Sequence, residues 1–305
     1  MNKMSPLYGL QSKKQLYKML NITNGRQFSN NSYDRTKIYI QQSEQRLIEA
    51  PNDLTKCAQY RIKNLLSKCD FPDYVFSGIK GRSYFSNAEK HKNCRYLFKT
   101  DISAFFPSIT RNKVYKFFLQ DLKTSPDVAK ILTDICTVDI TPAVSNDPIV
   151  SEYVSRKKIK SYHHLCTGSP VSPLLSYFVN KSMFDAMKTI ADNNGLVITI
   201  YMDDVFFSSK NEIPVGVRSQ IIKTFTKNGY NLSIKKLRYY KPYHFKKVTG
   251  VYVSPDNQLK IPNTLRFRIV QGYSNGRMRV PRQELKGLIT ASDVIEKGSF
   301  AHIKF

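Results

Sequence analysis

The feature that most restricts the fold is a run of β-forming residues interrupted by two adjacent aspartates. Residues 196–208 are rich in Val, Ile, Thr, Tyr and Phe on both sides of Met202-Asp203-Asp204. Branched and aromatic residues favour strands, and a short polar interruption between two such runs favours a tight turn. The segment therefore predicts a β-hairpin that carries Asp203 and Asp204 at its tip.

A third acid ends another predicted strand. Residues 95–101 read Arg-Tyr-Leu-Phe-Lys-Thr-Asp and stop at Asp101. If this strand and the hairpin share one sheet, three carboxylates converge. Two like charges about 4 Å apart repel by roughly 4 kcal/mol at an effective dielectric constant near 20. Such a cluster needs cations or a shared proton, and hard oxygen ligands in this number suit Mg²⁺. The alternative is a polar hairpin turn without a catalytic role.

The charge of the chain restricts its partners. Its 48 Lys and Arg residues outnumber 23 Asp and Glu residues, giving a formal net charge of +25. A globular chain this basic repels itself, and a polyanionic partner is the usual reason to tolerate that. No apolar run is long enough for a membrane-spanning helix, and the first residues lack a signal peptide. The composition therefore favours a nucleic-acid partner over a membrane.

The cysteines indicate a reducing compartment. They stand at positions 57, 69, 94, 136 and 166, and none forms a Cys-x-x-Cys pair. This spacing argues against a disulfide framework or a structural zinc site, and it favours a cytosolic protein. His163 and His164 lie near Cys166, but no second group completes a tetrahedral set of zinc ligands. We expect these three to be ordinary loop residues.

Apolar periodicity predicts an α+β protein. It indicates helices over five segments: 13–20, 54–67, the residues after Thr110 as N-cap, the residues from Pro173 past Met187, and 218–227. A hairpin is expected over 38–51, and a loop or irregular hairpin over 138–162. Near the acids, two helices should pack on a small antiparallel sheet. From residue 235 onward the chain is denser in Lys, Arg and Tyr, which favours a separate basic subdomain.

Several motifs around the acids strongly resemble those of reverse transcriptases. The motifs are residues 201–204 (Tyr-Met-Asp-Asp), 100–106 (Thr-Asp-Ile-Ser-Ala-Phe-Phe), 168–173 (Gly-Ser-Pro-Val-Ser-Pro), 46–51 (Arg-Leu-Ile-Glu-Ala-Pro), 78–83 (Gly-Ile-Lys-Gly-Arg-Ser) and the pair Lys235-Lys236. They follow the family's order over most of the chain. The resemblance implies a right-hand polymerase fold, with an N-terminal extension and fingers over 1–95. The palm, a small antiparallel sheet packed on helices, would span 96–245 with part of the fingers inserted. A helical basic thumb would span 246–305.

The resemblance assigns the chemistry to residues that match these motifs. Asp101, Asp203 and Asp204 would bind two Mg²⁺ ions, with the Ile102 carbonyl as a further ligand. Such a pair of ions activates an attacking hydroxyl and stabilises a leaving pyrophosphate. Lys236 would protonate that pyrophosphate. The resemblance therefore implies that the chain is an RNA-directed DNA polymerase.

Other matching residues would grip the incoming nucleotide: Arg46, Arg82, Phe106, Thr167 and Gly168. Arg46 and Arg82 would pair with the triphosphate, because guanidinium groups bind phosphate well. Phe106 would lie beneath the sugar and exclude ribonucleotides, whereas Phe105 is expected in the core. The family usually has Gln immediately before the glycine of this turn, where the chain has Thr167. The contact with the sugar should therefore be weaker or made differently.

Two more motifs resemble bacterial retron reverse transcriptases in particular. Residues 87–91 read Asn-Ala-Glu-Lys-His, which matches an Asn-Ala-x-x-His element, and residues 248–250 read Val-Thr-Gly. The residues expected to contribute to RNA binding are Asn87, His91, Val248, Thr249 and Gly250. The basic region from residue 235 onward would hold backbone phosphates.

A retron enzyme implies defined partners. A structured non-coding RNA would supply the template and, through a 2′-hydroxyl, the primer, leaving a branched RNA–DNA product (msDNA). Deoxynucleoside triphosphates would be the substrates, and a separate effector protein would complete an anti-phage defence system. The alternatives are another bacterial defence or group II intron-like reverse transcriptase, and a catalytically silent RNA-binding scaffold.

Overall fold

The computed structural model describes residues 4–28, 32–41, 46–274 and 277–303. The chain forms two compact units, and each is assembled from three separate segments. The first unit contains residues 1–79, 102–186 and 224–232, and the second contains 80–101, 187–223 and 233–305. The predicted division into fingers, palm and thumb stays a prediction. No helix in the described part of the chain has the length and apolarity needed to cross a membrane.

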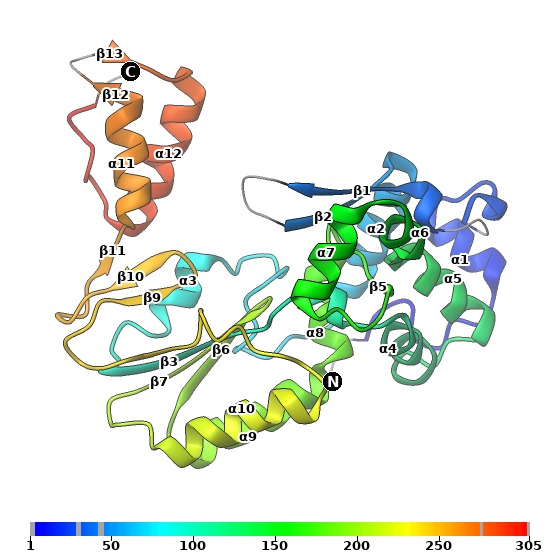
Figure 1. The fold of residues 1–305 in the computed structure, drawn as a ribbon, viewed down its shortest axis with the longest axis horizontal. Helices are drawn as coiled ribbons and strands as arrows, with labels where there is room; N and C mark the ends of the chain where they lie inside the picture. Colours follow the sequence, from blue (N-terminus) through cyan, green and yellow to red (C-terminus); the bar gives the residue numbers. More distant parts are fainter. Residues whose placement is uncertain (1–3, 29–31, 42–45, 275–276, 304–305) are drawn as a thin grey trace. The chain divides into compact units, whose positions relative to one another are not determined.

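The first unit is mainly helical (Figure 1). Its helices are α1 (Lys13–Leu20), α2 (Asp53–Leu66), α4 (Arg111–Lys116), α5 (Pro126–Cys136), α6 (Thr141–Asn146), α7 (Pro148–Lys157) and α8 (Ser172–Val179). Short 3₁₀ segments span Gly25–Phe28, Ser32–Arg35 and Phe106–Ser108, and a π-helical turn spans Phe117–Asp121. Strands β1 (Thr36–Gln41) and β2 (Arg46–Pro51) pair antiparallel, as do β4 (Thr137–Asp139) and β5 (His163–Leu165).

Several predictions for this unit are confirmed. Helices α1 and α2 and the β1–β2 hairpin lie where the sequence indicates, although residues 42–45 of that hairpin lie outside the described residues. Thr110 caps α4, because its hydroxyl oxygen accepts a hydrogen bond from the Lys113 N–H at 3.3 Å. Helix α5 was not among the predicted helices, although Ser125 and Pro126 form a typical helix start.

Three predictions for this unit are wrong. A loop over 138–162 is wrong, because α6 and α7 occupy most of the segment, although the strands at its two ends, β4 and β5, pair antiparallel. Asp147 caps α7 by accepting the Ile149 N–H at 2.9 Å. The helix from Pro173 is not continuous either. It breaks at Asn180, whose side-chain oxygen accepts a hydrogen bond from the Tyr230 hydroxyl at 2.6 Å, and α9 (Lys181–Asn193) follows. His163 and His164 also lie in strand β5 rather than in a loop.

The second unit contains the predicted antiparallel sheet. Strands β3 (Tyr96–Asp101), β6 (Val197–Tyr201), β7 (Asp204–Ser209) and β8 (Arg238–Tyr240) form it in the order β6-β7-β3-β8. The hairpin around the paired aspartates and the strand that ends on Asp101 are therefore confirmed, as is the α+β class. Helix α3 (Tyr84–Glu89) contacts β6 and lies on one face, while α9 and α10 (Val215–Lys227) lie on the other (Figure 1).

Smaller elements complete the second unit. Strands β9 (Lys246–Val248), β10 (Val251–Val253) and β11 (Leu259–Lys260) form a second sheet. Helices α11 (Asn263–Gly272) and α12 (Arg282–Ile295) follow, with a short pairing of β12 (Tyr273–Ser274) and β13 (Arg277–Met278) between them. The two helices share a core of their own around Ile269, Leu285 and Phe300.

Candidate active site

The three predicted acids lie together at one end of the four-stranded sheet, two on neighbouring strands and one in a hairpin turn. Asp101 ends β3, Asp204 begins β7, and the two residues are direct partners in the antiparallel register. Asp203 occupies the hairpin tip beside Met202, whose φ of +54° places it in the left-handed region. A non-glycine residue rarely adopts that conformation, and such strain tends to gather at functional sites. Backbone pairing therefore brings the three acids together.

Burial and mutual repulsion act on these carboxyl groups. Asp101 is buried, with an exposed fraction of 4%. Burial, followed by the charge of Asp101, raises the pKa of Asp203. Burial also raises the pKa of Asp204 to about 6; the charges of Asp203 and Asp101 add to this effect, and Lys99 opposes it. Because neighbouring charges disfavour ionisation of Asp203 and Asp204, the cluster favours a bound cation.

Two lysines neutralise the acids in the structure. The Lys99 Nζ lies 2.8 Å from Oδ1 and 2.9 Å from Oδ2 of Asp204. The Lys236 Nζ donates to Asp101 Oδ2 at 2.8 Å. Burial alone would lower the pKa of Lys236, but its bond to Asp101 and the nearby carboxylates outweigh burial and raise that pKa. The predicted site residue Lys236 thus lies next to the first acid.

Lys99 was missed by the motif comparison, although strand geometry could have indicated it. Alternate residues of a strand point to the same face, so Lys99 shares the face of Asp101. In the register Lys99 stands opposite Phe206, which makes Asp204 its diagonal neighbour. A long side chain can reach across that diagonal.

The donor set of this site suits magnesium. Three acidic side chains with no His or Cys among them are the oxygen ligands that Mg²⁺ prefers. Among the described residues, no group of three or more His, Cys, Asp or Glu side chains stands ready to hold a metal. The ammonium groups of Lys99 and Lys236 take up carboxylate oxygens that a metal would need. A bound metal would therefore have to displace these lysine contacts.

The family comparison agrees with this geometry. The reverse transcriptase (RNA-dependent DNA polymerase) family matches residues 35–253, which include all three acids. The chain belongs to the reverse transcriptase family. Its hairpin with Asp203 and Asp204 and the strand that ends on Asp101 both lie inside the matched region.

Curated relatives narrow the comparison to retrons. The chain is similar to the Retron Se72 reverse transcriptase of Salmonella heidelberg, with 27% identity over 209 residues, covering 67% of the chain and 49% of the relative. It is 24% identical to the Retron Ec83 reverse transcriptase of Escherichia coli over 254 residues, 80% and 77% of the two. The Retron Ec86 reverse transcriptase of the same species is 25% identical over 214 residues, 69% and 59%. These matches confirm the predicted resemblance to retron reverse transcriptases, and the alignment spans about half the length of the first relative.

The turn of Thr167 and Gly168 is joined to strand β2 through Glu49. The Thr167 N–H donates to Glu49 Oε2 at 2.7 Å, and the Gly168 N–H donates to the Glu49 carbonyl at 3.0 Å. The Glu49 N–H donates to the Thr167 hydroxyl at 3.2 Å. A Cβ at position 168 would collide with the Glu49 carbonyl oxygen, so only glycine fits there. The contacts of Thr167 and Gly168 with a nucleotide stay predictions.

The remaining residues of the predicted nucleotide set lie in three elements. Arg46 is exposed at the start of β2, and Arg82 is half-buried just before α3. Phe106 is half-buried at the start of a 3₁₀ segment, whereas Phe105 is 5% exposed and packs on the ring of Tyr230. The prediction that Phe105 belongs to the core is confirmed. The nucleotide contacts of Arg46, Arg82 and Phe106 stay predictions, as does the metal contact of the Ile102 carbonyl.

Part of the predicted RNA-binding set is corrected. Asn87, His91 and Val248 have exposed fractions of 0%, so these side chains have no surface to offer RNA. Both ring nitrogens of His91 lie 2.7 Å from hydroxyl groups, those of Ser208 and Thr199. Burial lowers the pKa of His91 to about 3, which keeps the ring neutral. His91 therefore fixes the end of α3 to the sheet.

The two retron motifs meet in the structure. The Asn87 side-chain amide donates to the Thr249 hydroxyl at 3.3 Å, and that hydroxyl donates to the Tyr84 carbonyl at 2.8 Å. Thr249 and Gly250 form the turn between β9 and β10, with φ values of +45° and +92°. Both are half-buried, and their contact with RNA stays a prediction. The motifs thus join α3 to the second sheet.

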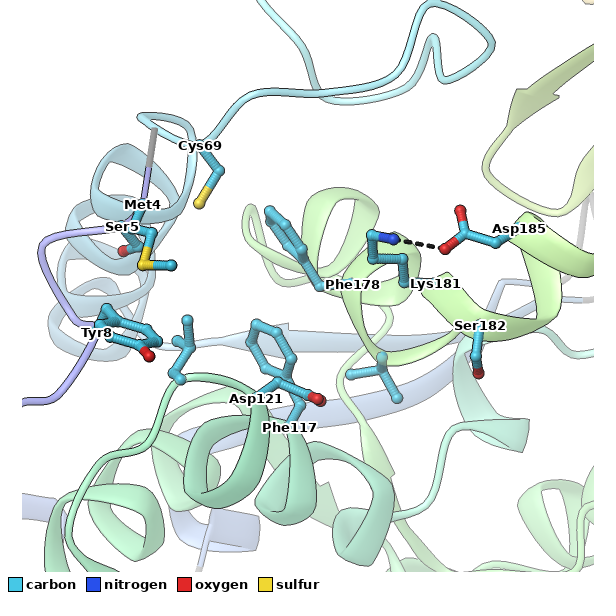
Figure 2. Close-up of a pocket in the computed structure, with 12 residues that line it drawn as sticks. Met4, Ser5, Tyr8, Cys69, Phe117, Asp121, Phe178, Lys181, Ser182 and Asp185 are labelled. Atoms are coloured by element: carbon cyan, nitrogen blue, oxygen red, sulfur yellow. Dashed lines mark hydrogen bonds and ion pairs between the residues drawn. The ribbon is translucent and has the colours of Figure 1, made fainter. Parts of the chain in front are cut away.

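A pocket of about 370 Å³ in the first unit is a separate feature (Figure 2). Its wall includes Met4, Phe117 and Phe178, and the Lys181–Asp185 ion pair lies at its edge. The Tyr74 hydroxyl donates to the other oxygen of Asp185 at 2.6 Å. None of the predicted site residues lines this pocket, which therefore is not the candidate active site.

Proposed function

We propose that the chain is the RNA-directed DNA polymerase of a retron, which copies part of a cognate structured RNA into DNA. The observation that carries the proposal is the pairing of Asp101 and Asp204 on adjacent strands of one sheet, with Asp203 at the neighbouring hairpin tip. The match to the reverse transcriptase family and the similarity to retron enzymes support it.

The proposed chemistry requires magnesium at the acids. Bound Mg²⁺ supplies activation of the primer hydroxyl and charge stabilisation on the leaving pyrophosphate. Asp101, Asp203 and Asp204 would hold it, since their carboxylates repel one another without a cation. Lys236 would give a proton to the pyrophosphate, because its ammonium group contacts Asp101 at the edge of the cluster and its side chain is 56% exposed.

The proposed partners follow from the charge of the chain and from its relatives. A net charge of +25 suits a structured RNA as template. By similarity to retron enzymes, an RNA 2′-hydroxyl would prime synthesis and leave a branched RNA–DNA product. A separate effector protein in the cytosol would complete a defence system.

Incorporation of labelled deoxynucleotides by the purified protein, with its co-purified RNA, tests the polymerase. Asp203→Asn should lower incorporation a thousandfold or more, about 4 kcal/mol of activation free energy, since a metal site supplies several kcal/mol. Asp192→Asn, on the exposed face of α9, is the matched control and should keep full activity. Equal background signal from wild type and Asp203→Asn would favour the silent RNA-binding scaffold instead.

Sequencing the co-purified nucleic acid tests the retron assignment. We expect DNA joined to RNA through a 2′,5′ branch. Linear DNA primed elsewhere would favour another bacterial defence or group II intron-like reverse transcriptase.

A further inference from the structure

Besides the three aspartates of the acid cluster, the chain has another carboxylate, distant in sequence, that is completely enclosed. Glu49 lies in β2, and its side chain and that of His164 in β5 both have exposed fractions of 0%. The His164 Nε2 lies 2.7 Å from Glu49 Oε1. A buried carboxylate is costly unless all its oxygens are paired. Here the second oxygen, Oε2, accepts the Thr167 N–H at 2.7 Å.

The hydrogen-bond partners of His164 show that the pair carries a proton. Its Nδ1 lies 2.8 Å from the Ser161 carbonyl oxygen, which can only accept, so Nδ1 must hold a hydrogen. The other nitrogen, Nε2, faces a carboxyl oxygen of Glu49. Without a proton between them, two lone pairs would face each other at 2.7 Å. The pair therefore contains one proton more than a neutral histidine and a free carboxylate.

The same glutamate determines the position of the following turn. Its side chain binds the Thr167 amide, its backbone N–H binds the Thr167 hydroxyl, and its carbonyl binds the Gly168 amide. The Cys166 thiol also donates to that carbonyl at 3.4 Å. Three successive residues of the turn are thus hydrogen-bonded to one residue of β2. The Glu49 carbonyl also lies so close to Gly168 that the turn has little room to move.

We propose that Glu49 and His164 are positioning residues that share one proton and thereby hold the Thr167–Gly168 turn in the conformation that receives the incoming nucleotide. The inference rests on the proposed function, because the nucleotide contact of the turn belongs to it. The pair does not touch the reacting atoms; it acts through the two amides of the turn. Loss of the proton is expected to loosen the turn and weaken nucleotide binding.

The surroundings of the pair favour titration of this proton alone. The other titratable groups near it are Asp139, His163, Cys166 and Tyr153. Burial raises the pKa of Cys166 and of Tyr153 and lowers the pKa of His163, so all three stay neutral near pH 7. Burial alone would lower the pKa of His164, but Glu49, the Ser161 carbonyl and Asp139 outweigh it and raise that pKa above 6.5.

Two substitutions of Glu49 test the role of the shared proton and the role of the hydrogen bonds separately. Glu49→Gln has the same shape; its amide oxygen can accept the Thr167 N–H, and its NH₂ can donate to a neutral His164. This variant should keep the turn without needing the extra proton. Glu49→Ala removes both bonds. Glu152→Gln, on the exposed surface of α7, is the matched control.

Steady-state incorporation across pH measures the effect on catalysis. Glu49→Ala should raise the KM for deoxynucleotide about tenfold or more, since bonds to a charged group are lost, with a smaller change in kcat. In the wild type, the KM should rise as the pH passes above 6.5 through the raised pKa of His164. Glu49→Gln should keep the wild-type KM at pH 7 within about twofold and lose this rise. An unchanged KM in Glu49→Ala, or identical pH profiles of wild type and Glu49→Gln, would overturn the proposal.

Hydrogen exchange gives a readout that does not depend on activity. The amide hydrogens of Thr167 and Gly168 should exchange faster in Glu49→Ala than in wild type, and at the wild-type rate in Glu49→Gln and Glu152→Gln. If wild type incorporates no nucleotide at any pH, the proposed function fails, while the exchange rates still decide whether the pair holds the turn. Equal exchange in all four proteins would refute the pair's positioning role.

Discussion

The acid cluster of the second unit and the Glu49–His164 pair of the first both neutralise carboxylates with basic side chains. Their exposure differs. Lys236 is 56% exposed and Lys99 is 15% exposed, whereas Glu49 and His164 are 0% exposed. A cation at the edge of the cluster can be exchanged for another, but the proton of the sealed pair has no replacement. The cluster can therefore exchange a lysine contact for a metal ion, whereas the enclosed pair can only gain or lose a proton.

The largest expected effect concerns activity at the cluster. Asp101→Asn should lower incorporation a thousandfold or more, because it removes a metal ligand. It should change the free energy of unfolding by less than about 1 kcal/mol, since it removes repulsion as well as a partly exposed ion pair. Incorporation assays and urea unfolding measure the two quantities. An active variant would show that Asp101 is not a required metal ligand, and a strongly destabilised one would show that it holds the fold together.

Substitutions in the Glu49–His164 pair should instead have their larger effect on the free energy of unfolding. His164→Ala leaves the Glu49 carboxylate buried without its partner, which should lower the free energy of unfolding by about 3–5 kcal/mol. Urea unfolding tests this. As a control, Lys181→Ala breaks an exposed pair on α9 and should cost only about 0.5 kcal/mol. A similar small loss in both variants would contradict the contrast between the two sites.

The two sites should also lose their contributions to stability in different pH ranges. In the folded protein the pKa of Asp204 is about 6, which is above its ordinary value of 3.8. Protonation of Asp204 therefore stabilises the fold fully below pH 3.8, and this stabilisation is lost as the pH rises through 6. The stability from His164, whose pKa is raised above 6.5, is lost only at higher pH. Mg²⁺ at a hundred times its Kd should add about 2.7 kcal/mol above pH 6. Thermal unfolding should show that gain without removing the alkaline decline. If Mg²⁺ also abolished the loss of stability at high pH, the acid cluster and the Glu49–His164 pair would not titrate independently.

The smallest expected effect is on metal affinity. Lys99→Met removes the ammonium group that lies 2.8 Å and 2.9 Å from the two oxygens of Asp204, so Mg²⁺ should bind about three to ten times more tightly to the free protein. Calorimetric titration measures this affinity directly. Lys188→Met, on the surface of α9, serves as the control. Weaker binding in Lys99→Met would mean that Lys99 assists the metal rather than replacing it.

The hairpin with its acids was predictable because strand alternation and a polar turn are local signals. The segment 138–162 was not, since α6 and α7 have six and ten residues and show too few turns to establish a period. At the helix break, Asn180 accepts a hydrogen bond from Tyr230, which is 50 residues away in the chain, and no local pattern reveals that contact.

The candidate site was also only partly predictable from the sequence. Motif resemblance located Asp101, Asp203 and Asp204, but it does not say whether a matching side chain is exposed. Asn87 and His91 were therefore assigned to RNA although both are enclosed. The pairing of Glu49 with His164 joins residues 115 positions apart, which only the folded chain reveals.

The hydrogen bond between Asn87 and Thr249 has a consequence for inheritance. It spans 162 positions of sequence, so a recombination event anywhere between the two motifs exchanges one partner without the other. A chimera that received Asn87 from one parent and a residue without a hydroxyl at position 249 from another would bury an amide with no partner. Because an unpaired buried amide costs about 1–3 kcal/mol, we expect the two positions to change together and the two motifs to pass between lineages as one unit.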